Sequence, residues 1–216
     1  DRVRKRPGVI FGSDGLEGCE HSAFEIISNS VDEAREGYGN VINITAYEDH
    51  SIEVEDFGRG IPLNSVVKAV SILNTGGKYD SKGYKKSVGL NGVGLKAVNA
   101  LSSHFYVEAY RDGMCSYAEF SAGKLLNDGM KETREKNGTY VRFIPDDNLF
   151  VGYSYNIEFV ESMIKNYSYL KKGLTLNLNG TAYKSENGLL DLINEKMSED
   201  PYYAPIHIAG EDIEIV

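Results

Sequence analysis

The segment from Phe24 to Arg35 constrains the fold of this chain more than any other. At 100° per residue on a helix, its apolar side chains repeat at the spacing of one face: Phe24, Ile27 and Val31. Its acidic and amide side chains gather on another face: Glu25, Asn29, Asp32 and Glu33. Because Asn is a poor helix former in mid-helix, this face favours a functional site. On the helix alone, an ordinary solvated polar face remains the alternative.

Composition narrows the class of protein. The chain has 216 residues and a net charge of −9, so it carries no overall basic surface for nucleic acid. The basic run at residues 2–6 is interpreted as a solvated surface segment. Cys19 and Cys115 lack the spacing of metal ligands, and free thiols are expected. No apolar run has the length of a membrane span and no signal peptide is visible, so the expected location is the cytoplasm.

Periodicity and glycine positions predict one α+β domain, with helices on one face of a mostly antiparallel sheet. A loop is expected over residues 7–19, and the first long helix over 20–36, ended by Gly37 and Gly39. Residues 74–92 are rich in Gly, Lys, Ser and Asn and predict either a functional lid or a disordered loop. The other predicted helices are 64–73, 94–102, 156–170 and 187–198. The predicted strands are 41–48, 51–56, 104–110, 115–121, 138–144, 173–179 and two within 205–216.

Several short motifs could carry chemistry. Asp56–Pro62 ends a predicted strand with two glycines around one Arg, which allows close approach to a flat ligand. Gly89–Gly94 opens a predicted helix, where backbone N–H groups can bind an anion. It is neither a dinucleotide fingerprint nor a P-loop, since no strand precedes it and no Gly-Lys-Ser/Thr follows. Gly76–Tyr79 and Tyr84–Lys86 precede it, and Gly138-Thr139 begins a later strand. Taken singly, these motifs are weak: a simple turn explains the glycines and Asp56 of the first but not its Arg, and a solvated loop is the better explanation of the lysine segments.

Together and in this order, the motifs resemble those of the Bergerat-fold ATPases, which include type II topoisomerase ATPase subunits, Hsp90, MutL and sensor histidine kinases. Within that group the chain is most similar to the B subunits of bacterial DNA gyrase and topoisomerase IV. The residues that carry this narrower resemblance are Arg4–Gly8, Asn29–Ala34, Gly58–Pro62, Gly76–Tyr79 and Val98–Ser102. The resemblance implies a two-layer sandwich in which residues 1–216 form a single ATP-binding domain, truncated before the transducer domain.

The resemblance also implies roles for individual residues. Glu25 would be the general base that activates water, and Asn29 would supply an oxygen ligand to Mg²⁺. Asp56 would accept from the adenine amino group, while Arg59 and Glu33 would pair across the pocket mouth. The remaining contacts implied are Gly60 and Thr139 at the adenine, Ile61 and Pro62 on the apolar floor, Lys78, Tyr84 and Lys85 in the lid, Leu90, Asn91, Gly92, Val93 and Gly94 around the phosphates, and Arg111 at the rim.

The same resemblance implies ATP and Mg²⁺ as cofactors, and dimerisation on ATP binding that gates DNA strand passage. DNA and the DNA-cleaving A subunit would bind parts of the full-length protein outside residues 1–216. We expect this piece alone to be a monomer that binds ATP but hydrolyses it very slowly, because a lysine from the transducer domain contacts the γ-phosphate. The alternatives are a nucleotide-gated clamp of the Hsp90 or MutL type and a sensor-kinase catalytic domain.

Overall fold

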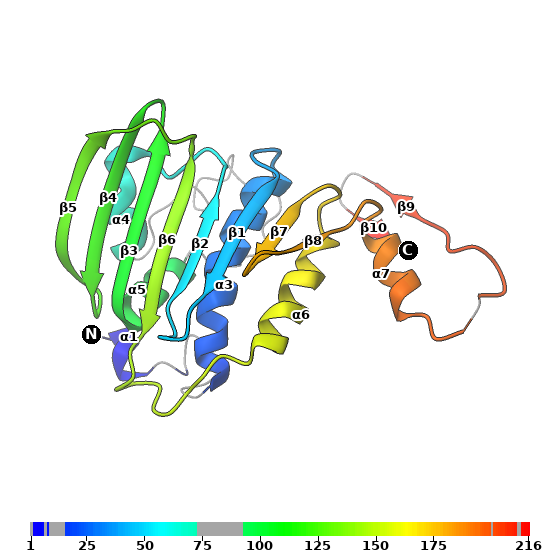
Figure 1. Ribbon diagram of the computed structural model, residues 1–216, viewed down its shortest axis with the longest axis horizontal. Coiled ribbons are helices and arrows are strands. Elements are labelled where there is room, and N and C mark those ends of the chain that lie inside the picture. Colours follow the sequence, from blue (N-terminus) through cyan, green and yellow to red (C-terminus); the bar gives the residue numbers. More distant parts are fainter. Residues whose placement is uncertain (1, 7, 9–15, 73–92, 200, 211–212) are drawn as a thin grey trace.

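The main sheet has eight strands in the order β5-β4-β3-β6-β2-β1-β7-β8 (Figure 1). Its strands are β1 (Val41–Ala46), β2 (Ile52–Asp56), β3 (Ser102–Arg111), β4 (Met114–Ser121), β5 (Lys124–Glu132), β6 (Gly138–Pro145), β7 (Thr175–Leu178) and β8 (Thr181–Lys184). The structure is a computed structural model that describes residues 2–6, 8, 16–72, 93–199, 201–210 and 213–216. All neighbouring strands of this sheet are antiparallel except β1 and β7, which are parallel.

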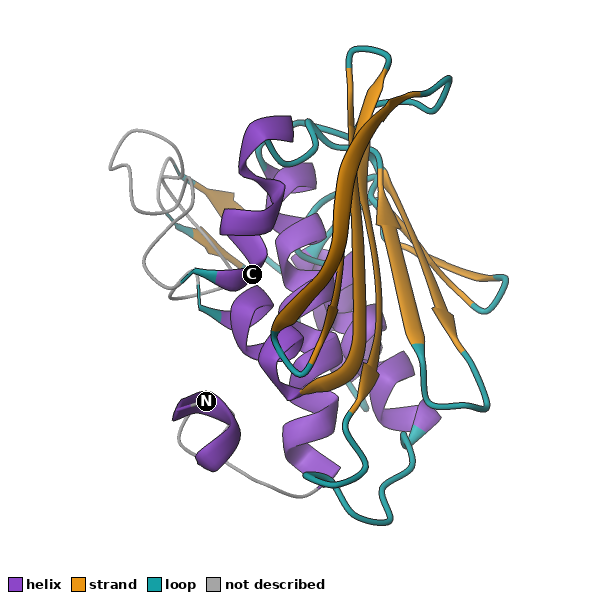
Figure 2. Ribbon diagram, turned by 90° about the vertical axis from the view of Figure 1, so that its left-hand side faces the viewer, coloured by secondary structure: helices purple, strands orange, loops and turns teal. Residues whose placement is uncertain are grey.

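The principal helices cover one face of the sheet, and Figure 2 shows the two layers from the side. They are α3 (Leu16–Arg35), α4 (Val66–Ser71), which follows the 3-10 turn η1 (Leu63–Ser65), α5 (Gly94–Leu101) and α6 (Ile157–Ser168). A short helix, α1 (Arg2–Lys5), lies near the chain start. Beyond β8 lie α7 (Leu189–Lys196) and a small two-stranded sheet of β9 (Ile208–Ala209) and β10 (Glu214–Ile215) (Figure 1). The predicted α+β sandwich is confirmed.

The hydrophobic core lies between the helices and the sheet. Alternation along β3 buries Phe105, Val107 and Ala109 on the helix side, as a half-buried strand requires. From α3, the predicted stripe contributes Ile27 and Val31, both fully buried. Further fully buried side chains complete the core: Ile42, Ile44, Ile52, Leu101, Phe120, Phe143, Ile164 and Leu176.

The structure corrects the start of the first long helix. The loop prediction for residues 7–19 is wrong at its end, because α3 already begins at Leu16. Cys19 and Ala23 are fully buried four residues apart, so the apolar stripe extends one turn before the predicted start. The prediction that the helix ends at Gly37 is confirmed by the cap described below.

Two strands escaped prediction, and both lie at the edges of the sheet. Nearly every residue of β5 is exposed, so this strand carries no apolar alternation that a sequence could reveal. The four-residue strand β8 is also largely exposed. The helix predicted over 64–73 is divided into η1 and α4. The predicted lid at 74–92 lies outside the described residues.

Both cysteines are free, as predicted, and both are buried; burial raises the pKa of the Cys115 thiol to about 11. Burial raises the pKa of the Cys19 thiol as well. Of the helices in the described ranges, none is long and apolar enough to cross a bilayer.

The interpretation of residues 2–6 as a solvated segment is wrong for Arg4. Its Nη1 donates to the carbonyl oxygen of Ala100 at 2.9 Å, and its Nη2 lies 2.6 Å from Oδ2 of Asp146. Asp146 also accepts from the backbone and side-chain nitrogens of Asn148. Arg4 therefore joins α1 to the end of α5 and to the segment after β6. Burial alone would raise the pKa of Asp146, but hydrogen bonds from Arg4 and Asn148 outweigh it and hold the pKa below 3.8.

Replacing Arg4 with Ala should lower the free energy of unfolding at pH 7 by about 1–3 kcal/mol, because a buried carboxylate loses a charged donor. When folding lowers the pKa of a carboxyl group, the charged group stabilises the folded state fully at pH values above its ordinary pKa. This stabilisation is lost as the pH falls through the pKa of the folded state. The difference between wild type and variant should therefore shrink below about pH 4, in urea titrations at several pH values. Lys5→Ala, at an exposed neighbour, is the control. An unchanged difference at low pH would contradict this account.

Candidate functional site

The carboxylate of Asp56 is the centre of the candidate site. It lies at the end of β2, directly opposite Thr139 in β6, and only 7% of the residue is exposed. Its Oδ1 accepts from the backbone N–H groups of Gly58, at 3.0 Å, and Thr139, at 3.2 Å. Its Oδ2 accepts from the hydroxyl of Ser30 on α3 at 2.7 Å. One side chain therefore connects the helix layer with two neighbouring strands.

Burial raises the pKa of Asp56 above its ordinary value of 3.8. Donation from Gly58, Ser30 and Thr139 favours the charged form, whereas the negative charge of Glu33 disfavours it, and the net shift is upward. Sequence reasoning identified Asp56 but not Ser30, whose hydroxyl holds it. The carboxylate is thus a buried acceptor whose electrostatic stabilisation is incomplete.

Glycines set the shape of the turn after β2. Gly60 has φ +76°, and a Cβ there would lie 2.7 Å from the carbonyl oxygen of Tyr110 and 2.8 Å from that of Gly138. The same position lies 3.1 Å from Cγ of Arg111, the predicted rim residue. A Cβ at Gly138 would lie 2.0 Å from the carbonyl oxygen of Asp56. Only glycine therefore allows the turn to pack this closely on the ends of β3 and β6.

Arg59 and Glu33 form the ion pair that the resemblance implied. Nη2 of Arg59 lies 2.8 Å from Oε1 of Glu33, and Nε lies 3.1 Å from Oε2. The backbone N–H of Arg59 also donates to Oε2 at 3.2 Å. The guanidinium carbon lies 4.2 Å from the ring centroid of Tyr38, a residue that sequence reasoning missed. Tyr38 follows the glycine that ends α3, and that position is the signal that could have identified it.

The other end of the candidate site is formed by the first half of α3 and the start of α5. A Cβ added at Gly94 would lie 1.8 Å from Oε2 of Glu25, so the Glu25 carboxylate lies directly against the first residue of α5. Val93 and Gly94 are half-buried there. The N-terminus of a helix favours anions through its backbone N–H groups and its dipole. A carboxylate at this end can accept a proton from water beside a bound anion.

Asn29 fits the predicted magnesium ligand in chemistry. Its Nδ2 donates to the carbonyl oxygen of Glu25 at 2.7 Å, which fixes the orientation of the side-chain amide one turn along α3. An amide oxygen is a hard ligand of the kind that Mg²⁺ prefers, and Mg²⁺ usually keeps several waters beside one or two protein oxygens. Asp32, predicted to lie on the same face, is instead only 1% exposed.

The other predicted site residues differ in exposure, and some lie outside the described part of the chain. Thr139 and Ile61 are half-buried, and Ile61 packs against the core. Pro62 is exposed. Six predicted contacts lie outside the described residues: Lys78, Tyr84, Lys85, Leu90, Asn91 and Gly92. The nucleotide roles of all predicted residues remain predictions.

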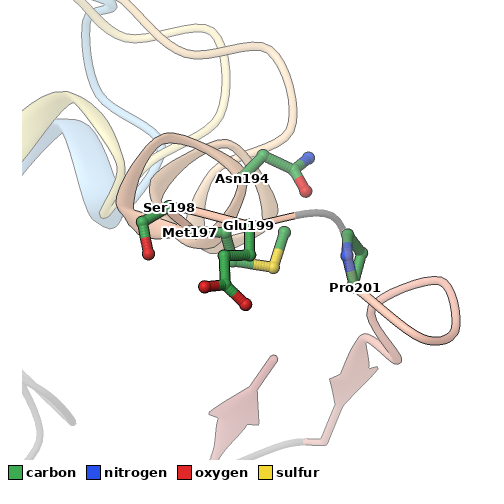
Figure 3. A pocket seen from close by; sticks show the side chains of 5 residues that line it. All are labelled: Asn194, Met197, Ser198, Glu199 and Pro201. Atoms are coloured by element: carbon green, nitrogen blue, oxygen red, sulfur yellow. The ribbon is translucent and has the colours of Figure 1, made fainter.

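A hollow of about 640 Å³ lies elsewhere, at the end of α7 (Figure 3). It is lined by Asn194, Met197, Ser198, Glu199 and Pro201. None of the predicted site residues that the structure describes lines this hollow. Among the described residues that line it, the charged group is the carboxylate of Glu199, which would repel an anionic ligand. This hollow therefore does not compete with the site around Asp56.

Replacing Asp56 with Asn should raise the melting temperature at pH 7–8 by about 2–4 °C, the shift that roughly 1 kcal/mol produces in a domain of this size. A raised carboxyl pKa means that the folded state loses stability as pH rises above 3.8 through the folded-state pKa. Asn removes that loss and can still accept from Gly58 and Thr139. Ser30→Ala should act in the opposite direction, because it removes a donor and keeps the charge. Calorimetry at several pH values measures both, and a lower melting temperature for Asp56→Asn would contradict the argument.

Known proteins resemble this chain in sequence and in fold. Residues 17–149 match the family described as "Histidine kinase-, DNA gyrase B-, and HSP90-like ATPase". The chain is 43% identical over 220 residues to the B subunit of DNA topoisomerase 4 from Borreliella burgdorferi, covering 99% of this chain and 37% of that protein. It is 40% identical over 189 residues to the protein of the same name in Staphylococcus aureus, covering 83% of this chain and 28% of that protein. The chain thus spans about a third of the length of these curated relatives.

A solved structure gives the same answer. The fold matches the crystal structure of the 43K ATPase domain of Thermus thermophilus gyrase B, in complex with an aminocoumarin, with a TM-score of 0.82 and 28% sequence identity. The match covers 99% of this chain and 60% of that one. The family match also spans the elements that hold Glu25, Asp56 and Gly94. This chain belongs to the family of histidine kinase-, DNA gyrase B- and HSP90-like ATPases.

Proposed function

We propose that this chain binds ATP with Mg²⁺ between α3, the turn after β2 and the start of α5. The adenine amino group donates to Asp56, and Thr139 and Gly60 border the base. The triphosphate lies toward Gly94, where Asn29 supplies an oxygen to Mg²⁺ and Glu25 accepts the proton of the attacking water. Bound Mg²⁺ would neutralise phosphate charge. Membership of the ATPase family supports nucleotide binding.

One observation carries this proposal. A single helix, α3, places Glu25 against the first residue of α5 and also places Ser30 on the buried carboxylate of Asp56. Five residues of a helix rise about 7.5 Å. The proposed anion site beside Glu25 and the hydrogen-bond acceptor Asp56 beside Ser30 are therefore separated by about this distance along the same helix. A ligand with a polar planar base at one end and phosphates at the other matches that arrangement.

We further propose that the chain is the ATP-binding domain of the B subunit from a bacterial type IIA DNA topoisomerase, with residues 1–216 as one nucleotide-binding unit. The names of the relatives at 43% and 40% identity, and the gyrase B neighbour, support this choice over a clamp of the Hsp90 or MutL type and over a sensor kinase. In the full-length protein, ATP binding would dimerise two B subunits and gate DNA strand passage. The DNA and the DNA-cleaving A subunit would contact parts outside this chain.

The proposed adenine contact predicts a change of base preference. Asp56→Asn should weaken binding of a non-hydrolysable Mg-ATP analogue roughly 10- to 100-fold, because the amino group loses a charged acceptor. The loss should be smaller for the matching inosine analogue, whose 6-oxo group can accept from the Asn amide. Isothermal titration of both ligands against wild type and variant measures the ratio. An unchanged preference between the two bases would remove Asp56 from this role.

The proposed role of Glu25 as general base predicts that its removal separates ATP binding from ATP hydrolysis. In the full-length protein, Glu25→Ala should abolish ATP turnover and leave the affinity for the analogue close to that of the wild type, since the carboxylate is needed for the chemical step. A coupled phosphate-release assay and a binding titration on the same preparation give both numbers. The isolated 216-residue chain should bind the analogue and turn ATP over very slowly. Retained turnover in the variant would exclude Glu25 as the base.

A further inference from the structure

The turn that ends α3 has the geometry of a Schellman cap. Gly37 has φ +93°, and its N–H donates to the carbonyl oxygen of Ala34 at 3.1 Å. The N–H of Tyr38 donates to the carbonyl oxygen of Glu33 at 3.0 Å. These are the two backbone bonds of the motif, with glycine in the left-handed conformation. The cap therefore ties the backbone of Tyr38 to the residue whose side chain binds Arg59.

A second glycine brings this cap against the turn after β2. Gly39 has φ +78°, and a Cβ there would lie 2.8 Å from the carbonyl oxygen of Phe57. The chain after Tyr38 thus packs closely on the backbone just before Arg59. Two separate backbone constraints, one on each side of Tyr38, bring its ring to the guanidinium.

Arg59 is held by two different interactions at once. The carboxylate of Glu33 binds the edge of its guanidinium at 2.8 and 3.1 Å, and the Tyr38 ring lies 4.2 Å from its central carbon. About a third of the Arg59 side chain is exposed, and 44% of Tyr38 is exposed. An ion pair at this exposure contributes little by itself and is screened by salt. A ring over the guanidinium adds attraction and excludes water from one side of the pair.

We propose that Tyr38 is a positioning residue of the nucleotide site, which holds the guanidinium of Arg59 in one plane beside the base acceptor Asp56. Glu33, which binds Arg59, also lies near Asp56: a Cβ at Gly58 would lie 3.1 Å from Oε2 of Glu33 and 3.2 Å from Oδ1 of Asp56. Tyr38 acts through Arg59 and preorganises the base end of the pocket, which lowers the ordering cost when a purine nucleotide binds. This inference rests on the proposed nucleotide function.

The test compares Tyr38→Phe with Tyr38→Leu in the 216-residue chain, by titration with a non-hydrolysable Mg-ATP analogue. Phe keeps the ring and should keep the wild-type affinity. Leu keeps apolar bulk without a ring and should weaken binding roughly two- to fivefold, the range expected for one partly exposed cation–π contact. Tyr47→Leu is the matched control, because Tyr47 is 43% exposed and the guanidinium carbon of Arg142 lies 5.5 Å from its ring centroid. Tyr47 lies beside the start of β2, at the other end of that strand from Asp56. It should leave affinity unchanged.

A spectroscopic readout separates positioning from general loss of structure. In the wild type and Tyr38→Phe, ring current should shift the Arg59 Nε–H proton upfield in a ¹H–¹⁵N spectrum, with the resonance assigned by its loss in Arg59→Lys. Tyr38→Leu should lose this shift at an unchanged melting temperature. Equal affinities of the Phe and Leu variants, alongside wild-type binding, would overturn the positioning role and leave the proposed function standing. Failure of the wild type to bind the analogue would overturn both.

Discussion

The buried carboxylate of Asp56 is the interaction on which the rest of the site depends. A charge with 7% residue exposure is costly unless it is hydrogen-bonded, and here its donors come from α3, from the turn and from β6. Those donors do not bring the pKa back to its ordinary value. The chain therefore keeps a destabilising charge at a position where a neutral amide would satisfy the same backbone donors. A function that needs a charged acceptor accounts for this arrangement, since sites commonly retain groups that oppose stability.

The helix α3 gives this site its rigidity. Ile27 and Val31 are fully buried in the core, so the rotation of the helix about its own axis is set by core packing. Once that rotation is set, the directions of Glu25 and Glu33 follow from helical geometry. One carboxylate then meets α5, and the other, two turns later, meets Arg59. Core packing and site geometry are consequences of the same twenty-residue element.

Sequence reasoning succeeded where the relevant spacing is local. The stripe of Ile27 and Val31, the strands β1 and β2 and the glycines that follow α3 are each predicted from patterns within a few residues. It failed for residues whose partners lie far away in the sequence, and for strands too exposed to show an alternation of buried and exposed residues. Arg4 donates to Ala100 and Asp146, and the basic run around Arg4 contains no pattern that predicts this pairing. The edge strand β5 is exposed along nearly its whole length, and its backbone pairs with β4 without any alternation of apolar residues that the sequence could show.

The glycine at the end of α3 has two roles, because it ends the helix and also fixes the position of Tyr38. Gly37 is needed because an L side chain is strained at φ +93°, and in that sense it only ends a helix. The same cap also fixes Tyr38 beside Glu33, and so beside the guanidinium that borders the base acceptor. A substitution at Gly37 would therefore disturb helix stability and pocket geometry together, whereas the ring of Tyr38 can be removed without touching the cap bonds, which are made by backbone atoms. The structural and functional contributions of this turn are separable at Tyr38 and inseparable at the glycine before it.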